Sequence, residues 1–169
     1  MYFSTGSLAT LDDAAAIATI YNQGIEDRVA TFETRLRTPQ EIEQWFDGVH
    51  PIVVLEADQQ QVIAFASTSL YRPRPCYAGI AEFSVYVERA YRKRGAGRLA
   101  LEGLLQEVEK AGFWKLVSRM FVENVASRAL LRRLGFREVG VYEKHAQLDG
   151  VWRDAVIVER LLPVNVLSG

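Results

Sequence analysis

Four stretches of the chain place hydrophobic side chains at the three- and four-residue spacing of an amphipathic helix. The clearest stripe has apolar residues at positions 101, 104, 105 and 108. The stripes predict helices over residues 14–25, 39–50, 96–111 and 125–134. Thr10 and Asp13 have the spacing of a capping box ahead of the first helix, and Asn124 precedes the last one as a candidate N-cap.

Runs of β-branched and aromatic residues between these helices predict strands. They are residues 3–9, 52–55, 62–70, 80–87, 114–122, 137–148 and 152–161, and Asp149-Gly150 predicts a tight hairpin between the last two. The order β-α-α-β-β-β-α-β-α-β-β predicts one α/β (α+β) domain over residues 1–169. We expect a mixed central sheet of about seven strands with helices on both faces. Residues 163–169 are expected to form a loose tail.

Composition narrows the possible classes of function. The chain has 169 residues, 49% of them hydrophobic and 24% charged, which is typical of one globular domain. Its formal net charge of −1 gives no overall field that would attract nucleic acid or a membrane. Cys76 is the only cysteine, so no disulfide forms within the chain, and we expect a cytoplasmic protein. The sequence has no signal-peptide pattern, no apolar run of about 18 residues, and no metal-ligand spacing among its histidines and Cys76.

A loop rich in arginine and glycine follows the predicted strand 80–87. Residues 92–98 are Arg-Lys-Arg-Gly-Ala-Gly-Arg and lead into the helix 96–111. Gly95 and Gly97 let the backbone bend tightly and approach a ligand closely. The beginning of a helix offers unpaired N–H groups and the positive end of a dipole. With four cationic side chains nearby, the loop is suited to binding a pyrophosphate.

Two known patterns fit this loop. Gly95, Gly97 and Ala100 match the loose dinucleotide fingerprint G-x-G-x-x-A, but that fingerprint also requires an acidic residue about 20 positions later. Glu123 is the nearest candidate and comes late. The pattern R-x-x-G-x-G, formed by Arg92, Gly95 and Gly97, is the fuller match.

Together with the preceding strand sequence Ser-Val-Tyr-Val at 84–87, this loop resembles the acetyl-CoA loop of the GNAT acetyltransferases. The predicted order of elements is similar to the GNAT fold over nearly the whole chain. Within the family, the chain looks most like the phosphinothricin acetyltransferase branch, which includes methionine sulfoximine and arsinothricin N-acetyltransferases. The segments that carry this resemblance are 13–22, 30–33, 71–74, 82–87, 124–127, 134–136 and 150–154.

The resemblance implies that acetyl-CoA is the cosubstrate. Its pantetheine arm would pair with the backbone of the strand 80–87 and contact Asn124, and its pyrophosphate would lie on the loop. The implied cofactor-binding residues are Val85, Tyr86, Val87, Arg92, Lys93, Arg94, Gly95, Ala96, Gly97, Arg98 and Asn124. For Asn124 alone, a purely structural role as a helix cap is an equal alternative.

Glu82 is the candidate general base that removes a proton from the acceptor amine. It interrupts an apolar strand, and two-residue alternation places it on the same face as Ser84 and Tyr86. Burial there would raise the pKa of the Glu82 carboxyl toward a useful value. The alternative is a solvated or salt-bridged carboxylate on an exposed face, and the resemblance favours the catalytic interpretation. The resemblance also implies that the backbone N–H of Val85 stabilises the oxyanion.

One position departs from the family pattern. Family members often carry Tyr or His seven positions after the asparagine, as the acid for the leaving thiolate, whereas this chain has Leu131. Leucine donates no proton, so water or another hydroxyl serves, or the thiolate leaves unprotonated. This departure keeps a non-catalytic acyl-CoA-binding module open as an interpretation.

Arg72 and Arg74 are the candidate receptors for an anionic acceptor. They flank a proline that restricts their placement, and guanidinium groups bind carboxylate or phosphinate oxygens bidentately. A solvated turn is the alternative. Tyr77 and Phe32 are further candidates for the substrate pocket, and Phe32 fits a position in the core equally well.

Three classes of function follow from the sequence. The first is an acetyl-CoA-dependent N-acetyltransferase that acts on a small amino-acid-like amine. The second is a protein or peptide N-acetyltransferase. The third is a non-catalytic module that binds acyl-CoA or a dinucleotide. We expect a homodimer, with no nucleic acid or membrane partner.

Overall fold

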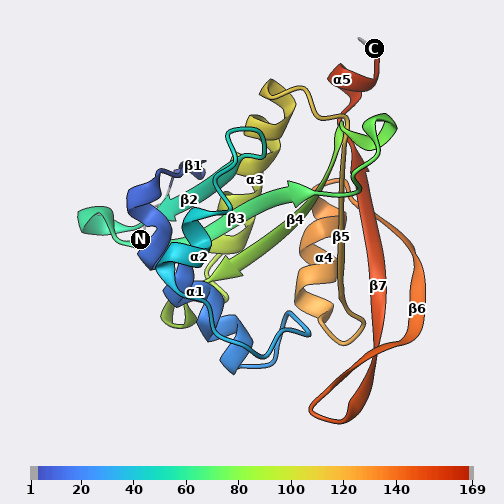
Figure 1. Cartoon of the computed structure of the whole chain (residues 1–169), viewed down its shortest axis with the longest axis horizontal. Coiled ribbons are helices and arrows are strands. Elements are labelled where there is room, and N and C mark those ends of the chain that lie inside the picture. The colour runs from blue at the N-terminus through green and yellow to red at the C-terminus, as the bar shows by residue number, and fades with distance from the viewer. Residues whose placement is uncertain (1–3, 168–169) are drawn as a thin grey trace.

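One mixed β-sheet runs through the computed structural model, which describes residues 4–167 (Figure 1). In this part of the chain the strands lie in the order β1-β2-β3-β4-β5-β7-β6, and every neighbouring pair except β4–β5 is antiparallel. The strands are β1 (Ser7–Leu8), β2 (Ile52–Glu56), β3 (Val62–Leu70), β4 (Ile80–Val87), β5 (Lys115–Phe121), β6 (Arg137–Leu148) and β7 (Val151–Leu161). The predicted seven-stranded mixed sheet is confirmed.

Helices cover both faces of this sheet, as the sequence predicts (Figure 1). Helices α1 (Ala14–Glu26) and α2 (Pro39–Glu43) pack on one face against buried residues of β2, β3 and β4. Helices α3 (Ala96–Lys110) and α4 (Val125–Arg133) pack on the other face. We call these two sides of the sheet the α1 face and the α3 face. A short helix, α5 (Pro163–Leu167), follows β7.

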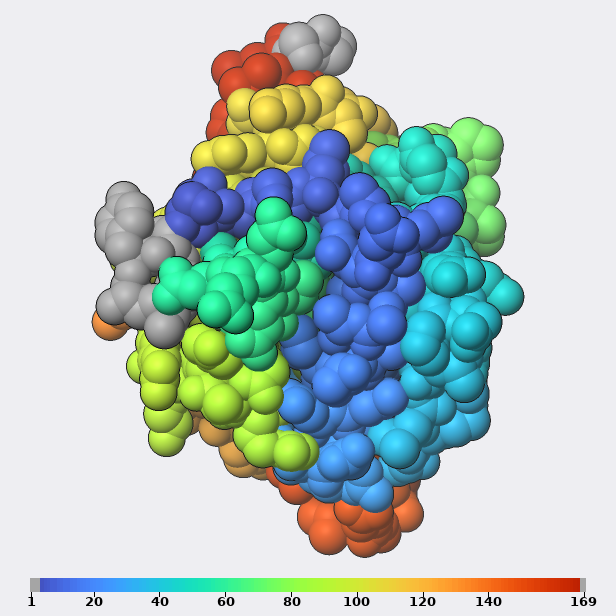
Figure 2. Space-filling model, turned by 90° about the vertical axis from the view of Figure 1, so that its left-hand side faces the viewer, coloured from blue at the N-terminus to red at the C-terminus, as the bar shows by residue number. Residues whose placement is uncertain are grey.

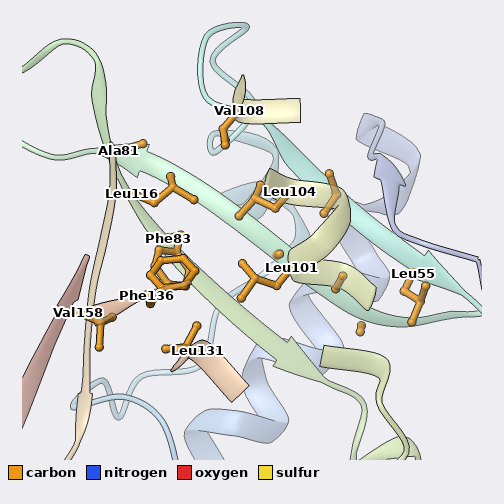
Figure 3. Packing of buried hydrophobic residues seen from close by; sticks show 14 of the residues in the cluster. Leu55, Ala81, Phe83, Leu101, Leu104, Val108, Leu116, Leu131, Phe136 and Val158 are labelled. Atoms are coloured by element: carbon orange, nitrogen blue, oxygen red, sulfur yellow. The ribbon is translucent and has the colours of Figure 1, made fainter. Parts of the chain in front are cut away.

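The larger hydrophobic core lies between the sheet and α3 (Figure 3). Leu101, Leu104 and Val108 of α3 are fully buried there, which confirms the helical stripe seen in the sequence. Phe83 of β4 belongs to the same cluster, whereas Tyr86 of β4 belongs to the cluster beneath α1. Because both faces of β4 are covered, its sequence is almost continuously apolar.

The β6–β7 hairpin closes through the predicted turn. Asp149 and Gly150 both have positive φ, 51° and 79°, as a type I′ turn requires. Arg28, just after α1, donates a 2.8 Å hydrogen bond from Nε to Oδ2 of Asp149. The tip of the hairpin is therefore tied to the end of α1 on the α1 face.

The second helix is shorter than predicted. It ends at Glu43, although the apolar side chains of Trp45 and Phe46 still pack against the cluster beneath α1. Oδ1 of Asp47 accepts hydrogen bonds from the backbone N–H groups of Val49 (2.8 Å) and His50 (2.7 Å). A side chain that binds nearby N–H groups offers the backbone an alternative to continued helix.

The two ends of the described chain also differ from the prediction. The first strand comprises only Ser7–Leu8 of the predicted residues 3–9, and residue 3 lies outside the described part. Residues 163–167 form α5 rather than a loose tail, and residues 168–169 are not described. Nδ2 of Asn165 donates to the carbonyl oxygens of Glu109 (2.9 Å) and Phe113 (2.7 Å). These bonds tie the C-terminal segment to the end of α3.

Gly103 permits the close approach of α3 to the backbone that precedes β1. A Cβ atom on Gly103 would lie 2.3 Å from the carbonyl oxygen of Gly6. We expect Gly103→Ala to lower the free energy of unfolding by about 1–3 kcal/mol, the usual cost of overpacking. The melting temperature would fall by about 2–4 °C for each kcal/mol.

Gly140→Ala is the matched control for thermal denaturation. A Cβ atom at Gly140 has no described neighbour within 4 Å. Its melting temperature should stay close to that of the wild type. Equal stability of the two variants would show that the backbone of α3 does not need to approach Gly6 closely.

Candidate active site

Strands β4 and β5 begin side by side and then separate (Figure 1). Their parallel pairing runs from Ile80↔Lys115 to Glu82↔Val117. Beyond that point β4 continues with β3 as far as Val87, and β5 continues with β7 as far as Phe121. Ser118 makes the last link across the opening, because its Oγ donates to the carbonyl oxygen of Phe83 at 2.8 Å. The sheet is therefore split at its centre.

A cavity of ≈ 560 Å³ occupies this split. It is lined by β4, β5, the beginning of α3 and the beginning of α4. The lining includes most of the predicted cofactor-binding residues, namely Val85, Tyr86, Val87, Arg92, Lys93, Gly95, Ala96, Gly97, Arg98 and Asn124. Of that set, only Arg94 lies outside the lining, and its guanidinium stands 5.6 Å from the centre of the Tyr91 ring.

The open edge of β4 presents backbone groups to this cavity. The N–H of Glu88 points toward β3, where it donates to the carbonyl oxygen of Ile63 at 2.7 Å. The carbonyl of Phe83 points the other way, toward β5. Because successive backbone groups of a strand alternate in direction, the N–H and C=O of Val85 and Val87 also point toward β5. The ladder with β5 has already ended there, so these groups face the cavity. An unpaired strand edge of this kind is suited to an extended amide-containing ligand.

The loop between β4 and α3 is shaped to bind an anion. Lys93 and Gly95 have positive φ, 66° and 82°, so successive N–H groups turn inward ahead of the first turn of α3. The first N–H groups of α3 have no partner within the helix, and its dipole favours negative charge. In the described chain, neither Lys93 nor Arg94 has a carboxylate within ion-pair distance, whereas Arg98 binds Glu102 at 2.9 Å. The loop thus keeps cationic side chains available for phosphate groups.

Arg92 anchors this loop to the end of α1. Its Nη1 donates to Oδ2 of Asp27 at 2.7 Å, and Arg89 binds the same carboxylate with two further hydrogen bonds. Figure 2 shows the loop (yellow-green) beside the lower end of α1 (blue). The hydrogen bond from Arg89, followed by that from Arg92, lowers the pKa of the Asp27 carboxyl. The anchor is therefore intact near neutral pH and weakens only as the pH falls through that lowered pKa.

We expect Asp27→Asn to raise the KM for a ligand of the loop. An exposed ion pair stabilises by about 0.2–1 kcal/mol, so the KM should increase by at most about fivefold. Asp12→Asn is a matched control, because Asp12 is exposed and lies far from the loop in the sequence. An unchanged KM in Asp27→Asn would show that the loop keeps its shape without this anchor.

Asn124 lies at the beginning of α4 and has two roles in the geometry. Its Oδ1 accepts a hydrogen bond from the N–H of Ser127 at 3.3 Å, which confirms the predicted cap. Asn124 also lines the cavity. Arg128 supports this corner, because it donates to the carbonyl of Val122 at 2.8 Å and to Glu138 at 2.6 Å. Hydrogen bonds from Arg128 and then Arg132 lower the pKa of Glu138 to about 2.

Glu82 stands at the point where β4 and β5 separate, but it is not buried as expected. One third of its side chain (33%) is exposed, and its Oε1 lies 3.7 Å from Nη2 of Arg119. The separation of the strands opens this position to solvent, so a carboxylate there avoids the cost of burial. Tyr86 is the buried residue of the same face of β4, and burial raises the pKa of its hydroxyl.

The structure does not place the predicted substrate residues in the cavity lining. Arg72, Arg74 and Tyr77 are exposed on the segment between β3 and β4, and Arg72 packs over the Tyr71 ring at 4.7 Å. Phe32 lies on the α1 face of the sheet, where its ring meets that of Phe121 at 5.0 Å.

Sequence reasoning missed Arg119, which lines the cavity next to Glu82. Val117 pairs with Glu82 in the sheet, so Arg119, two residues later, shares the face that carries Glu82. The signal for this juxtaposition lies in the register between two strands whose paired residues are 35 positions apart in the sequence. No local sequence pattern reports that register.

Comparison with known proteins identifies this arrangement. A family model described as the acetyltransferase (GNAT) family matches residues 17–136. The chain belongs to the GNAT acetyltransferase family. It is therefore an N-acetyltransferase that uses acetyl-CoA, and the split strand edge with its anion-binding loop fits that cosubstrate. The family assignment replaces the dinucleotide-binding and non-catalytic interpretations.

Three relatives of this GNAT protein bear on its substrate. An L-methionine sulfoximine/L-methionine sulfone acetyltransferase of Pseudomonas aeruginosa is 30% identical over 158 residues, 89% of this chain and 90% of the relative. A phosphinothricin acetyltransferase of Sinorhizobium meliloti, solved with acetyl-CoA, has a TM-score of 0.88 at 28% identity and covers 96% and 89% of the two chains. A ribosomal-protein-alanine N-acetyltransferase of Brucella melitensis has a TM-score of 0.87 at 30% identity, with 93% and 99% covered.

No three His, Cys, Asp or Glu side chains in residues 4–167 gather into a group that would hold a metal ion. Within the same range, none of the helices combines the length and the apolar character needed to cross a bilayer.

Proposed function

We propose that this enzyme acetylates the amino group of a small amino-acid-like acceptor of the phosphinothricin, methionine sulfoximine or arsinothricin type. One observation carries the proposal. The open edge of β4 leads from an anion-binding loop to a carboxylate and a guanidinium, Glu82 and Arg119, which lie together on the α1 face. The names of the relatives from Pseudomonas aeruginosa and Sinorhizobium meliloti support the same class of acceptor.

In this proposal the acetyl group passes directly from thioester to amine. Acetyl-CoA supplies the activated acetyl group, with its pyrophosphate on the loop that begins at Lys93 and its pantetheine along Val85 and Val87. Much of the rate enhancement comes from holding the two reactants together. The N–H of Val85 points into the split and donates to the oxyanion that forms on the acetyl carbonyl. The C–N bond forms, the C–S bond breaks, and coenzyme A leaves as a thiol or thiolate.

Glu82 has the role of general base in this reaction. The acceptor arrives mainly as an ammonium ion at neutral pH and must lose a proton before it attacks. In this proposal the acceptor binds on the α1 face of the split, which we call the acceptor side. Glu82 lies on that face and accepts the proton directly or through one water molecule. Its partial exposure gives the proton a route to solvent.

The leaving thiolate takes no proton from the position that family members often use. Leu131 lies in the cavity lining and is almost completely buried in the core beside Phe83 (Figure 3). Its side chain has no proton to donate. Water, or a hydroxyl elsewhere in the lining, protonates the thiolate, or the thiolate departs as an anion.

Arg72, Arg74, Tyr77 and Phe32 stay predicted substrate-binding residues. The three residues on the segment between β3 and β4 are exposed, so binding an acceptor requires that segment to close over it. In that arrangement Arg72 and Arg74 hold the acidic side group of the acceptor. Phe32 forms an apolar wall with Phe121 on the α1 face.

A protein N-acetyltransferase is the second candidate, and the similarity to the Brucella melitensis protein favours it. Such an enzyme binds an extended peptide along a groove.

We also expect a homodimer, because β6 is an edge strand with exposed Val139, Val141 and Tyr142. Light scattering during size-exclusion chromatography tests that expectation. A cytoplasmic location stays a prediction from the sequence.

A panel assay tests the proposed function. Release of free thiol from acetyl-CoA is measured with phosphinothricin, methionine sulfoximine, arsinothricin, ordinary amino acids and alanine-terminated peptides, and mass spectrometry identifies the product. We expect turnover with at least one free amino-acid analogue and none with the peptides. Turnover with peptides alone would contradict the proposal in favour of protein acetylation.

A further inference from the structure

Arg119 occupies a defined position on the acceptor side of the split. The register Glu82↔Val117 and the alternation along β5 place Arg119 on the α1 face, one step further into the opening than Glu82. Phe121 follows on the same face and is covered by Phe32. Arg119 is also a lining residue of the cavity, whereas Arg72 and Arg74 are not. Among residues 4–167, Arg119 is the cation that lies within ion-pair distance of the predicted base.

The guanidinium of Arg119 is only loosely engaged. Its Nη2 lies 3.7 Å from Oε1 of Glu82, beyond hydrogen-bond distance, and its Nη1 lies 3.3 Å from Nε2 of His145. Arg89, by contrast, grips Asp27 through two hydrogen bonds of 3.0 and 2.9 Å. A guanidinium carries five N–H donors in a planar fork that matches a carboxylate. Most of the donors of Arg119 therefore remain available to a ligand.

We propose that Arg119 binds the free α-carboxylate of an α-amino acid acceptor. In an α-amino acid a single carbon atom joins the carboxylate and the amine. A carboxylate held by Arg119 therefore places the amine beside Glu82, whose Oε1 is 3.7 Å from the guanidinium. The spacing between the two side chains matches the spacing between the two groups of the acceptor. The inference rests on the proposed function, and it assigns the group that decides which amines are accepted.

This assignment separates free amino acids from other amines. The N-terminal residue of a protein, which offers the acceptor amine, has its α-carboxyl group in a peptide bond, and a simple amine has no carboxyl group. Neither therefore offers an anion to Arg119. The acidic side group of an analogue stays free for another contact, such as Arg74. Binding of the acceptor carboxylate also draws Arg119 away from its loose contact with Glu82, which leaves that carboxylate free to accept the proton.

The test compares a free amino acid with its own carboxamide. The free amino acid is the best acceptor found in the panel, and the carboxamide keeps the amine and side chain but lacks the negative charge. Wild-type enzyme should prefer the acid strongly in kcat/KM. We expect Arg119→Gln to lower kcat/KM for the acid by about 10- to 150-fold, the range for losing a hydrogen bond between charged groups at tenfold per 1.4 kcal/mol. The carboxamide should lose no more than a few-fold.

Two further variants complete the design. Arg119→Lys keeps the charge but not the planar fork, so it should recover part of the preference for the acid. Arg74→Gln is the comparison variant on the segment between β3 and β4. It should leave the ratio of acid to carboxamide unchanged, because Arg74 is proposed to hold the side group of the acceptor and not its α-carboxylate. Nearly half of the Arg119 side chain is exposed (46%), so these variants should fold. Thermal denaturation should show that each variant is folded.

Three outcomes would overturn the inference. Equal losses for acid and carboxamide would mean that Arg119 only positions Glu82. An unchanged ratio in Arg119→Gln, or a ratio abolished by Arg74→Gln instead, would assign the carboxylate to another residue. These results leave the proposed function intact, because wild type would still acetylate free amino acids. Failure of the proposed function would show itself differently, as wild-type turnover confined to peptides.

Discussion

Replacing Glu82 with glutamine should lower kcat by about 10²- to 10⁴-fold, the usual contribution of a general base. Glutamine keeps the size of the side chain but accepts no proton from the acceptor ammonium. The substitution should leave the affinity for coenzyme A unchanged, because Glu82 does not line the cavity between β4 and β5. The pH–rate profile should also change, since the group that accepts the proton has been removed. Steady-state kinetics across a range of pH checks both effects.

Glu43→Gln is the control for this experiment. Glu43 is exposed at the end of α2 and lies on a different element from the split strands. It should behave as wild type. If Glu82→Gln showed the same rate and the same pH profile as Glu43→Gln, Glu82 would have no part in proton transfer, and another group or water would be the base.

Replacing Gly97 with valine should weaken acetyl-CoA binding while the protein stays folded. A Cβ atom on Gly97 would stand 3.4 Å from Cγ2 of Val87, 3.7 Å from Cγ1 of Val85 and 3.9 Å from Cδ2 of Leu130. A single methyl group therefore fits in ordinary contact, but the two further methyl groups of valine must enter the cavity or displace its walls. Overpacking of this kind costs about 1–3 kcal/mol, which corresponds to roughly 5- to 150-fold in KM for acetyl-CoA.

Gly97→Ala provides the matched control. We expect its KM for acetyl-CoA to change by only a few-fold, and thermal denaturation should show that both variants are folded. The KM for the acceptor should be similar in wild type and both variants. If a folded Gly97→Val bound acetyl-CoA as tightly as wild type, the beginning of α3 would not be the phosphate-binding element.

The sequence predicted the elements whose signals are local. The α3 stripe ending in Val108, the turn at Asp149-Gly150 and the cap at Asn124 each depend on residues close together in the chain, and all three are confirmed. The loop around Gly95 was predicted for the same reason. Its positive φ and its position before α3 follow from glycine itself.

The features that sequence reasoning missed depend on distant contacts. The exposure of Glu82 results from the separation of β4 and β5, and the proximity of Arg119 results from their register. The second helix ends early because the Asp47 side chain binds the backbone beyond it. Helix α5 (Pro163–Leu167) is held against the end of α3 by the two hydrogen bonds of Asn165. None of these contacts has a periodic pattern in the sequence.

A crystal structure with coenzyme A and a free amino-acid acceptor tests most directly the claim that acetyl transfer takes place in the split between β4 and β5. We predict the pyrophosphate on the N–H groups from Lys93 into the first turn of α3, and the pantetheine beside Val85 and Val87. The thiol should lie near the N–H of Val85, with the acceptor amine facing Glu82. Coenzyme A bound elsewhere, or an acceptor amine on the α3 face of the sheet, would contradict the account.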